Sequence, residues 1–199
     1  MVHGNMTNRC QWAGTDPHLI RYHDREWGVP LHNDKKLFEF LVLEGAQAGL
    51  SWITVLKKRP AYRKAFDNFD FNKVAQYRED KVRQLLNDAG IIRNELKIRS
   101  AIRNAGAFIQ VRNEFGTFNK YIWQFVRHKP IQNKWKRLKD IPPKTELSDL
   151  ISQDLKKRGF NFVGSTIVYS HIQATGMVND HTTDCFRYNE IKKLQATGN

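Results

Sequence analysis

Apolar residues recur at intervals of three and four along almost the whole chain, and this periodicity limits the fold more than any other feature. It is the spacing of one face of an α-helix, whereas the alternation typical of a strand is nearly absent. Periodic segments start near residues 37, 53, 82, 98, 118, 147 and 165. We therefore predict an all-α fold whose last helix spans about residues 165–175 and stops at Gly176.

One of these predicted helices contains an isolated acidic residue. Asn33 or Asp34 can cap this helix, and residues 49–51 interrupt it. Glu44 is the only charged residue between Phe40 and Leu56. Burying a carboxylate among apolar side chains without a partner is costly. Glu44 therefore either reaches the surface or lies in a pocket where its oxygens bind a ligand, and the sequence leaves both possibilities open.

Aromatic residues gather close to this helix in the sequence. Trp12, Tyr22 and Trp27 lie within the first thirty residues, and Trp52 follows the helix of Glu44. Such rings are usually part of a hydrophobic core. They are also the side chains that sandwich an extruded nucleobase.

The segment 82–109 predicts two helices joined by a tight turn. Gly90 is placed to end the first helix, the link consists of residues 89–92, and the second helix opens near Arg93 or Asn94. The free N–H groups at the start of a helix can bind a phosphate, and Arg93 and Lys97 add positive charge there. The turn resembles a helix-hairpin-helix element, although Ile92 replaces its second glycine; a simple helical pair is the alternative. The candidate DNA-backbone contacts are Gly90, Ile92, Arg93 and Lys97.

The charge balance favours a polyanionic partner. The 33 basic and 20 acidic residues of the 199-residue chain give a formal net charge of +13, which attracts nucleic acid, although such charge can also serve solubility alone. Residues 128–144 contain six Lys or Arg, opposed only by Asp140, together with three prolines. We expect a long basic loop that is solvated, with no dedicated DNA contact for any single lysine.

Two cysteines and two histidines lie at the ends of the chain. Cys10 and His23 are close in sequence, and His181 and Cys185 are four residues apart, as on one helical turn. Two thiolates and two imidazoles are a common structural zinc set. Inert buried thiols, or a Cys10–Cys185 disulfide, are the alternatives.

The sequence excludes several classes of protein. No apolar run is long enough to cross a membrane, and the first residues do not have the pattern of a signal peptide. Two distant cysteines do not form a disulfide framework. We expect a cytoplasmic, monomeric protein without a membrane partner.

Taken together, these motifs resemble those of the DNA-3-methyladenine glycosylase I family, within the helix-hairpin-helix glycosylase superfamily. The resemblance runs from about residue 10 to residue 185 and is carried by long motifs: Cys10 with Trp12, Asp16-Pro17, Tyr22-His23-Asp24, Glu26-Trp27-Gly28, LEGAQAGLSWITVLKKR (43–59), DAGIIRN (88–94), LKKRGFNFVGSTIVYS (155–170) and GMVNDH (176–181).

The resemblance implies an enzyme that flips 3-methyladenine out of double-stranded alkylated DNA. It would hydrolyse the N-glycosidic bond, leave an abasic site and release the free base. The chain would be one unit, 1–199, with zinc-binding ends at 10–30 and 176–186 and a base-excision core at 33–175 that includes a hairpin near 80–110.

The family also implies roles for single residues. Cys10, His23, His181 and Cys185 would bind a structural Zn²⁺, which agrees with their types and spacing. Glu44 would be the catalytic-site carboxylate that reads the polar edge of the base, and Leu50 would fill the gap left in the DNA. Trp52 would stack on the base, and Tyr22 and Trp12 would complete the pocket.

The chemistry of such a substrate fits the residues. Alkylation at N3 makes the adenine cationic and therefore a good leaving group without protonation. Most relatives of this fold place a catalytic Asp about 20 residues after the hairpin, but residues 97–112 contain no acidic residue. Two rivals remain. A non-catalytic zinc-containing DNA-binding module would scatter Glu44, Tyr22 and Trp52, whereas a zinc hydrolase would need an open coordination position.

Overall fold

The computed structural model describes residues 8–197, and this part of the chain is mostly helical, as the periodicity predicts. One short sheet is added, in which two strands pair in parallel with Ile131 opposite Val178 and Gln132 opposite Asn179. The α-helices are α1 (Pro17–Arg25), α2 (Asp34–Gln47), α3 (Trp52–Ala65), α4 (Phe71–Val74), α5 (Glu79–Asn87), α6 (Glu95–Phe115), α7 (Phe118–Trp123), α8 (Glu146–Lys157), α9 (Ser165–Ala174) and α10 (Phe186–Thr197); the strands are β1 (Ile131–Gln132) and β2 (Val178–Asn179).

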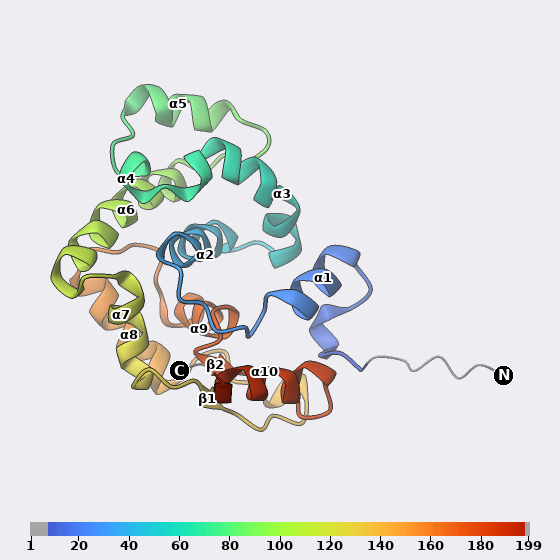
Figure 1. The fold of residues 1–199 in the computed structure, drawn as a ribbon. Helices are drawn as coiled ribbons and strands as arrows, with labels where there is room; N and C mark the ends of the chain where they lie inside the picture. Colours follow the sequence, from blue (N-terminus) through green and yellow to red (C-terminus); the bar gives the residue numbers. More distant parts are fainter. Residues whose placement is uncertain (1–7, 198–199) are drawn as a thin grey trace.

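Helix α2 lies at the centre of the molecule, and α3, α6 and α9 pack around it (Figure 1). All of its residues from Leu37 to Ala46 are buried, which is the behaviour of a helix that is apolar on every side. The Asn33 side chain accepts a hydrogen bond from the backbone N–H of Lys36 at 3.0 Å and so fixes the start of the helix. After Gln47 the chain turns at Gly49, whose φ of +76° is a conformation that glycine adopts readily.

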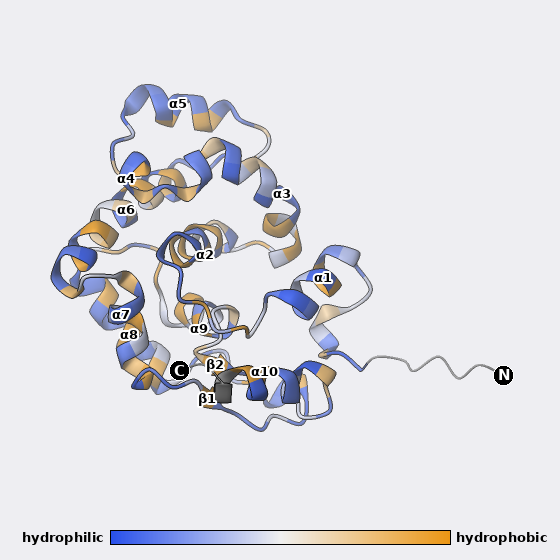
Figure 2. Cartoon of the chain, viewed as in Figure 1, coloured by the Kyte–Doolittle hydropathy of each residue, from blue (hydrophilic) through white to orange (hydrophobic). Residues whose placement is uncertain are grey.

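Helices α5 and α6 form the predicted hairpin at the edge of the molecule. Helix α5 turns its hydrophobic residues inward and its hydrophilic ones outward (Figure 2). The predicted end at Gly90 is wrong: α5 stops at Asn87, because the Asp88 carboxylate accepts the N–H of Gly90 at 2.7 Å and closes a turn. The link therefore covers residues 88–94. Gly90 is needed for a different reason, since a Cβ there would lie 2.9 Å from the Cβ of Ala61.

The first described residues lie beside the start of α10 (Figure 1). The N–H of Phe186 donates to the carbonyl of Asn8 at 2.9 Å, and the Asn8 side chain donates to the carbonyl of Asp184 at 2.9 Å. The expectation that the helix ending near Gly176 is the last one is wrong, because α10 follows it and buries Ile191. The short sheet then joins this region to the start of the basic loop.

No helix among residues 8–197 is both long and apolar enough to cross a membrane.

Candidate functional site

A cavity of about 380 Å³ opens between the N-terminal segment, α2, α3, α9 and the loop around residues 138–143. Its volume lies in the range of small-molecule sites. The aromatic residues singled out in the sequence converge on it: Trp12, Tyr22, Trp27 and Trp52 all line the wall, together with Glu44. The scatter of these side chains that a non-catalytic DNA-binding module would show is therefore not observed.

Glu44 is a pocket residue rather than a surface residue. Only 3% of its surface is exposed, and its Oε2 lies 2.8 Å from Nδ1 of His171 on α9, a residue 2% exposed. Burial raises the pKa of Glu44 above its ordinary value of 4.5, and the nearby His171 opposes that rise. The other oxygen, Oε1, is buried and has no hydrogen-bond partner.

Unpartnered polar atoms are concentrated around this cavity. Six buried side-chain nitrogen or oxygen atoms of the described residues have no partner, and Nε1 of Trp12, Oε1 of Glu44 and Nε1 of Trp52 belong to residues that line the cavity. A fourth, Nε2 of His171, is on the imidazole that contacts Glu44. Because buried polar groups are nearly always paired in folded proteins, this concentration indicates a place for a polar ligand.

The aromatic rings form a continuous assembly. The ring centroids of Tyr22 and Trp52 lie 5.3 Å apart, and those of Trp12 and Trp27 lie 4.9 Å apart. Burial, followed by the charge of Glu44, raises the pKa of Tyr22, so its hydroxyl stays protonated and able to donate a hydrogen bond. Such a site suits a flat, cationic ring that can lie against π-faces and beside a carboxylate.

Two walls of the cavity were not predicted from the sequence. One is α9, which contributes Tyr169 and Gln173 at a spacing of four residues. The other is the second half of the basic loop, with Leu138, Ile141 and Pro142. The helical spacing of α9 is a signal that could have been used, whereas the loop gives none, because prolines and lysines are typical of solvated segments.

Leu50 borders a second hollow beside the first. That hollow shares Glu44 and Gln47 with the main cavity and is also lined by Gly49 and Leu50. Leu50 is 41% exposed although it is apolar.

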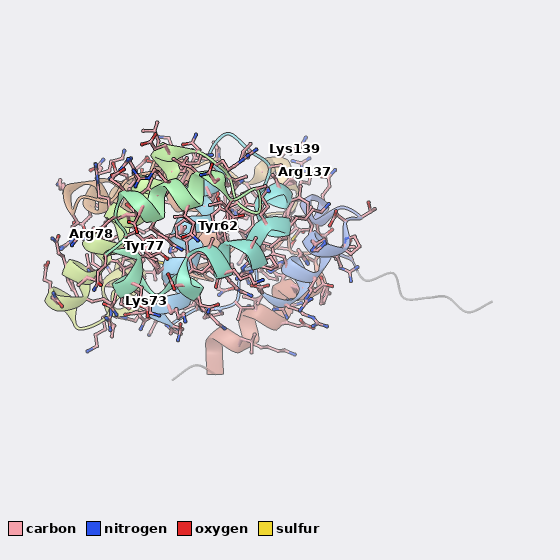
Figure 3. All side chains as sticks on the ribbon, turned by 90° about the horizontal axis from the view of Figure 1, so that it is seen from above. Tyr62, Lys73, Tyr77, Arg78, Arg137 and Lys139 are labelled. Carbon is pink, nitrogen blue, oxygen red and sulfur yellow. The ribbon has the colours of Figure 1, made fainter. Side chains whose placement is uncertain are left out.

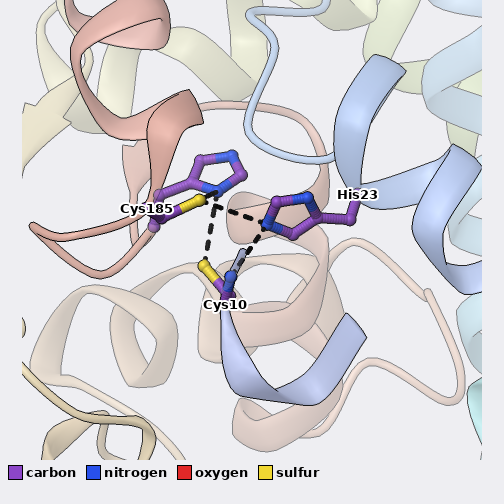
Figure 4. A group of neighbouring side chains, drawn as sticks. Cys10, His23 and Cys185 are labelled. Carbon is purple, nitrogen blue, oxygen red and sulfur yellow. Dashed lines mark hydrogen bonds between the residues drawn. The ribbon is translucent and has the colours of Figure 1, made fainter. Parts of the chain in front are cut away.

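The two cysteines and two histidines from the chain ends meet in one buried cluster. Cys10, His23 and Cys185 converge in Figure 4, and together with His181 their candidate ligand atoms all lie within 4.8 Å of one another. The sulfur–nitrogen distances are 3.5 Å for Cys10–His181, 3.4 Å for Cys185–His23 and 3.6 Å for Cys185–His181. Both thiols are free, so the disulfide alternative is not observed.

The outward-facing nitrogen of each histidine is fixed by an acceptor. His23 Nδ1 lies 2.8 Å from the carboxylate of Asp24, and His181 Nε2 lies 3.1 Å from the carbonyl of Trp27. The opposite ring nitrogens therefore face the sulfurs as acceptors. Gly28, with φ +79°, allows this approach, since a Cβ there would lie 3.0 Å from Nε2 of His181. Orientation of this kind is typical of metal-binding histidines.

The hairpin offers fewer phosphate contacts than the sequence predicts. The N–H of Gly90 is bound by Asp88, and the N–H of Ile92 donates to the Tyr62 hydroxyl at 3.1 Å. The ammonium of Lys97 donates to the carbonyls of Ala46 and Ala48 at 2.8 and 2.6 Å, where it caps α2. Of the four candidates, only Arg93 is exposed and has no hydrogen-bond partner within the described part of the chain.

Comparisons with known proteins identify the family of this chain. Residues 12–188 match the family model of methyladenine glycosylases. The chain is 52% identical to DNA-3-methyladenine glycosylase 1 of Escherichia coli (strain K12) over 180 residues, which cover 90% of this chain and 96% of that protein. It therefore belongs to the methyladenine glycosylase family.

Solved structures show the same fold. A crystal structure of 3-methyladenine DNA glycosylase I (TAG) superposes with a TM-score of 0.88 at 49% identity, covering 90% of this chain and 98% of that one. A 3-methyladenine DNA glycosylase I solved in complex with 3-methyladenine superposes with a TM-score of 0.87 at 34% identity, covering 90% and 96%.

Proposed function

We propose that this protein is a DNA repair enzyme that excises 3-methyladenine from alkylated DNA by hydrolysing the N-glycosidic bond. The observation that carries this function is the buried Glu44 carboxylate, whose Oε1 has no partner in a cavity walled by aromatic rings. Membership in the methyladenine glycosylase family supports it independently.

Glu44 selects the substrate by charge. Methylation at N3 leaves the adenine ring positively charged, and a carboxylate in a water-poor pocket attracts that cation far more strongly than it would in water. The Trp52 ring, with Tyr22 and Trp12, adds stacking, which is worth about 1–3 kcal/mol per base. Undamaged adenine gains the stacking without the charge attraction.

The bond is broken without a strong acid from the protein. The cationic base leaves as a neutral molecule, so the leaving group needs no added proton. The carboxylate of Glu44 also favours the positive charge that builds on the sugar as the bond lengthens. His171 holds Oε2 of Glu44, so the free Oε1 is the atom available to the base.

DNA is held outside the pocket while the base is inside it. We assign Leu50 to the gap that the flipped nucleotide leaves in the stack, because it is apolar, exposed and at the pocket rim. The α5–α6 pair acts as the helix-hairpin-helix element, with Arg93 as its exposed cation.

A structural zinc ion would join the two chain ends. Tetrahedral zinc with bonds of about 2.3 Å to sulfur and about 2.0–2.1 Å to nitrogen keeps such ligand atoms about 3.5 Å apart. The distances of 3.4–3.6 Å between the sulfurs and the histidine nitrogens fit that geometry. Cys10, His23, His181 and Cys185 would saturate the ion, so its role is to hold the 10–30 and 176–186 segments together and not to activate water.

Release of free 3-methyladenine from methylated duplex DNA tests the function. The purified protein should release 3-methyladenine and leave abasic sites, whereas Glu44→Gln should release it much more slowly. If the wild-type protein binds the duplex but releases no base, the assignment as a glycosylase is wrong and the DNA-binding module is the better description.

A further inference from the structure

The basic loop (residues 128–144) forms part of the wall of the base pocket. Leu138, Ile141, Pro142 and Pro143 line the cavity, although Leu138 is still 38% exposed. The Gly49–Leu50 turn borders the adjoining hollow, which shares Glu44 and Gln47 with this cavity. The loop is therefore an edge of the opening through which any base must enter.

A buried carboxylate fixes the loop from behind. Asp180, 1% exposed, accepts hydrogen bonds from the side chains of Asn133 at 2.6 Å and Trp135 at 2.8 Å. Its second oxygen accepts from Tyr169 at 2.5 Å and Gln173 at 2.8 Å, both of which line the pocket. The carbonyl of Trp135 also accepts the N–H of Thr183 at 2.9 Å. A loop fastened in this way presents its side chains in a defined position.

Lys134, Lys136 and Lys139 of this loop are exposed, whereas Lys144 is paired with Asp149 at 3.3 Å. Asn133 and Trp135 are turned toward Asp180, while Lys134 and Lys136 alternate with them and are exposed. Arg137 is paired with Asp140 at 3.0 Å, but no hydrogen bond or salt bridge holds the ammonium of Lys136 or Lys139 in the described chain. Figure 3 shows Arg137 and Lys139 close together at one end of the molecule.

A flipped nucleotide places its own phosphates at the pocket opening. The base lies inside while the deoxyribose and its two phosphates stay on the strand outside, so the lesion strand must cross the rim. Free ammonium groups at that rim face polyanionic backbone at close range. The hairpin, with three of its four candidate contacts engaged internally, leaves much of this binding to other residues.

We propose that the basic loop is a second DNA-binding element, in which Lys136 and Lys139 contact the phosphates that flank the flipped nucleotide. The inference rests on the proposed base excision and goes beyond it by assigning a backbone-binding surface to a segment that the sequence alone describes as a solvated loop. Asp180 connects this surface to the pocket wall, so the loop positions the strand and the cavity together.

The experiment compares two double variants that remove the same charge. Lys136→Gln with Lys139→Gln alters the loop. Lys73→Gln with Arg78→Gln alters two exposed residues that lie toward the other end of the molecule (Figure 3). Binding is measured against salt on a duplex carrying one abasic-site analogue, which needs no catalysis. Two lost phosphate contacts should flatten the slope of log K against log salt by about 1.8 and weaken binding about 10-fold or more at 0.1 M salt.

A modified duplex locates the contact. Neutral methylphosphonates replace the two phosphates that flank the abasic-site analogue. These should weaken binding of the wild-type protein and of the Lys73/Arg78 variant, but have little further effect on the loop variant, because that contact is already lost. If the methylphosphonates weakened binding of the loop variant as much as binding of the Lys73/Arg78 variant, the loop would act only through long-range charge. The proposal would then be overturned.

Binding of free 3-methyladenine provides the remaining control. It should be unchanged in the loop variant, since neither lysine lines the cavity; weaker binding of the free base would show that the substitutions deform the pocket, against the proposal. Failure of the proposed function would look different: the wild-type protein would release no base, whatever the salt dependence of its binding to the abasic duplex.

Discussion

The pocket and the Cys/His cluster are both assembled from distant segments, but they differ in whether their buried polar atoms have hydrogen-bond partners. In the cluster, each histidine has one ring nitrogen on a protein acceptor and the other facing sulfur. In the pocket, Oε1 of Glu44 and Nε1 of Trp52 have no partner. Satisfied atoms indicate a site that maintains the fold, while unsatisfied ones indicate a site that binds a transient ligand. Substitutions should therefore affect stability in one region and excision in the other.

The largest expected effect is on stability, in the cluster. Cys185→Ser removes a thiolate ligand, and zinc binding supplies on the order of 10 kcal/mol in small metal-dependent domains. We expect the free energy of unfolding to fall by several kcal/mol, and the purified wild-type protein to contain about one zinc per chain. Thermal unfolding with and without a chelator, together with metal analysis, measures this. A metal-free wild-type protein of unchanged stability would contradict it.

The next effect is on excision, in the pocket. Glu44→Gln keeps the shape and removes the charge, so the loss of a charge-assisted contact of about 1.5–3 kcal/mol should slow excision and weaken binding of free 3-methyladenine roughly 10- to 100-fold. Stability and affinity for undamaged DNA should change little. Single-turnover base release and calorimetric binding of the free base measure the effect.

Glu39 supplies a matched control on the same helix. It is also a buried carboxylate, but its Oε1 accepts hydrogen bonds from Arg59 at 2.7 Å and Arg63 at 2.9 Å. Glu39→Gln should therefore lower stability and leave base binding nearly intact, the reverse of Glu44→Gln. If both variants lose stability and neither loses excision, the contrast between partnered and unpartnered atoms does not separate the two kinds of site.

A smaller effect is the dependence of excision on pH. Because burial raises the pKa of Glu44, its carboxylate should protonate, as pH falls, at a higher pH than an exposed glutamate with the ordinary value of 4.5. Excision should fall through that window. The same raised pKa means that the folded state binds the proton more tightly, so Glu44's contribution to stability should rise as excision falls. Glu44→Gln should abolish both changes.

His171 tests the cause of this pH dependence. Its charge and its hydrogen bond to Glu44 hold down the pKa of that carboxyl. His171→Leu should therefore move the acid limb of the excision profile to higher pH, with little change in the salt dependence of DNA binding. An unshifted profile would show that His171 does not set the ionisation of Glu44.

Sequence reasoning found one of these regions more completely than the other. The types and spacing of the four cluster residues predict their site, because the chain has only two cysteines and each has a histidine nearby. The position of Glu44 stayed open, since its partner His171 is 127 residues away and periodicity carries no information about such contacts. Periodicity also could not predict that the basic loop lines the cavity, because Asp180, which binds this loop, is 47 residues from Asn133.

Errors in the fold have equally local causes. The sequence predicts that Gly90 ends α5, but the helix stops earlier because the Asp88 side chain accepts the N–H of Gly90. The glycine is required because Ala61 approaches closely. Helix α10 is not predicted because its apolar residues do not gather on one face, although Ile191 is fully buried against the rest of the molecule. Tertiary contacts, not propensity, determine both features.

The smallest expected effect belongs to Arg93, the one hairpin candidate left exposed. A single phosphate contact contributes about 0.9 to the slope of log K against log salt. Arg93→Ala should reduce the slope by about that amount and weaken binding similarly for methylated and undamaged duplexes, because a phosphate carries no information about the base. Titrations of both duplexes at several salt concentrations measure this.

Lys97→Ala is the informative companion to Arg93→Ala. The ammonium of Lys97 is bound to the carbonyls of Ala46 and Ala48, so the substitution should reduce stability through α2 and leave the slope nearly unchanged. If Lys97→Ala flattened the slope as much as Arg93→Ala does, Lys97 would be contacting DNA phosphate as the sequence pattern predicts, and its role as a cap of α2 would be secondary.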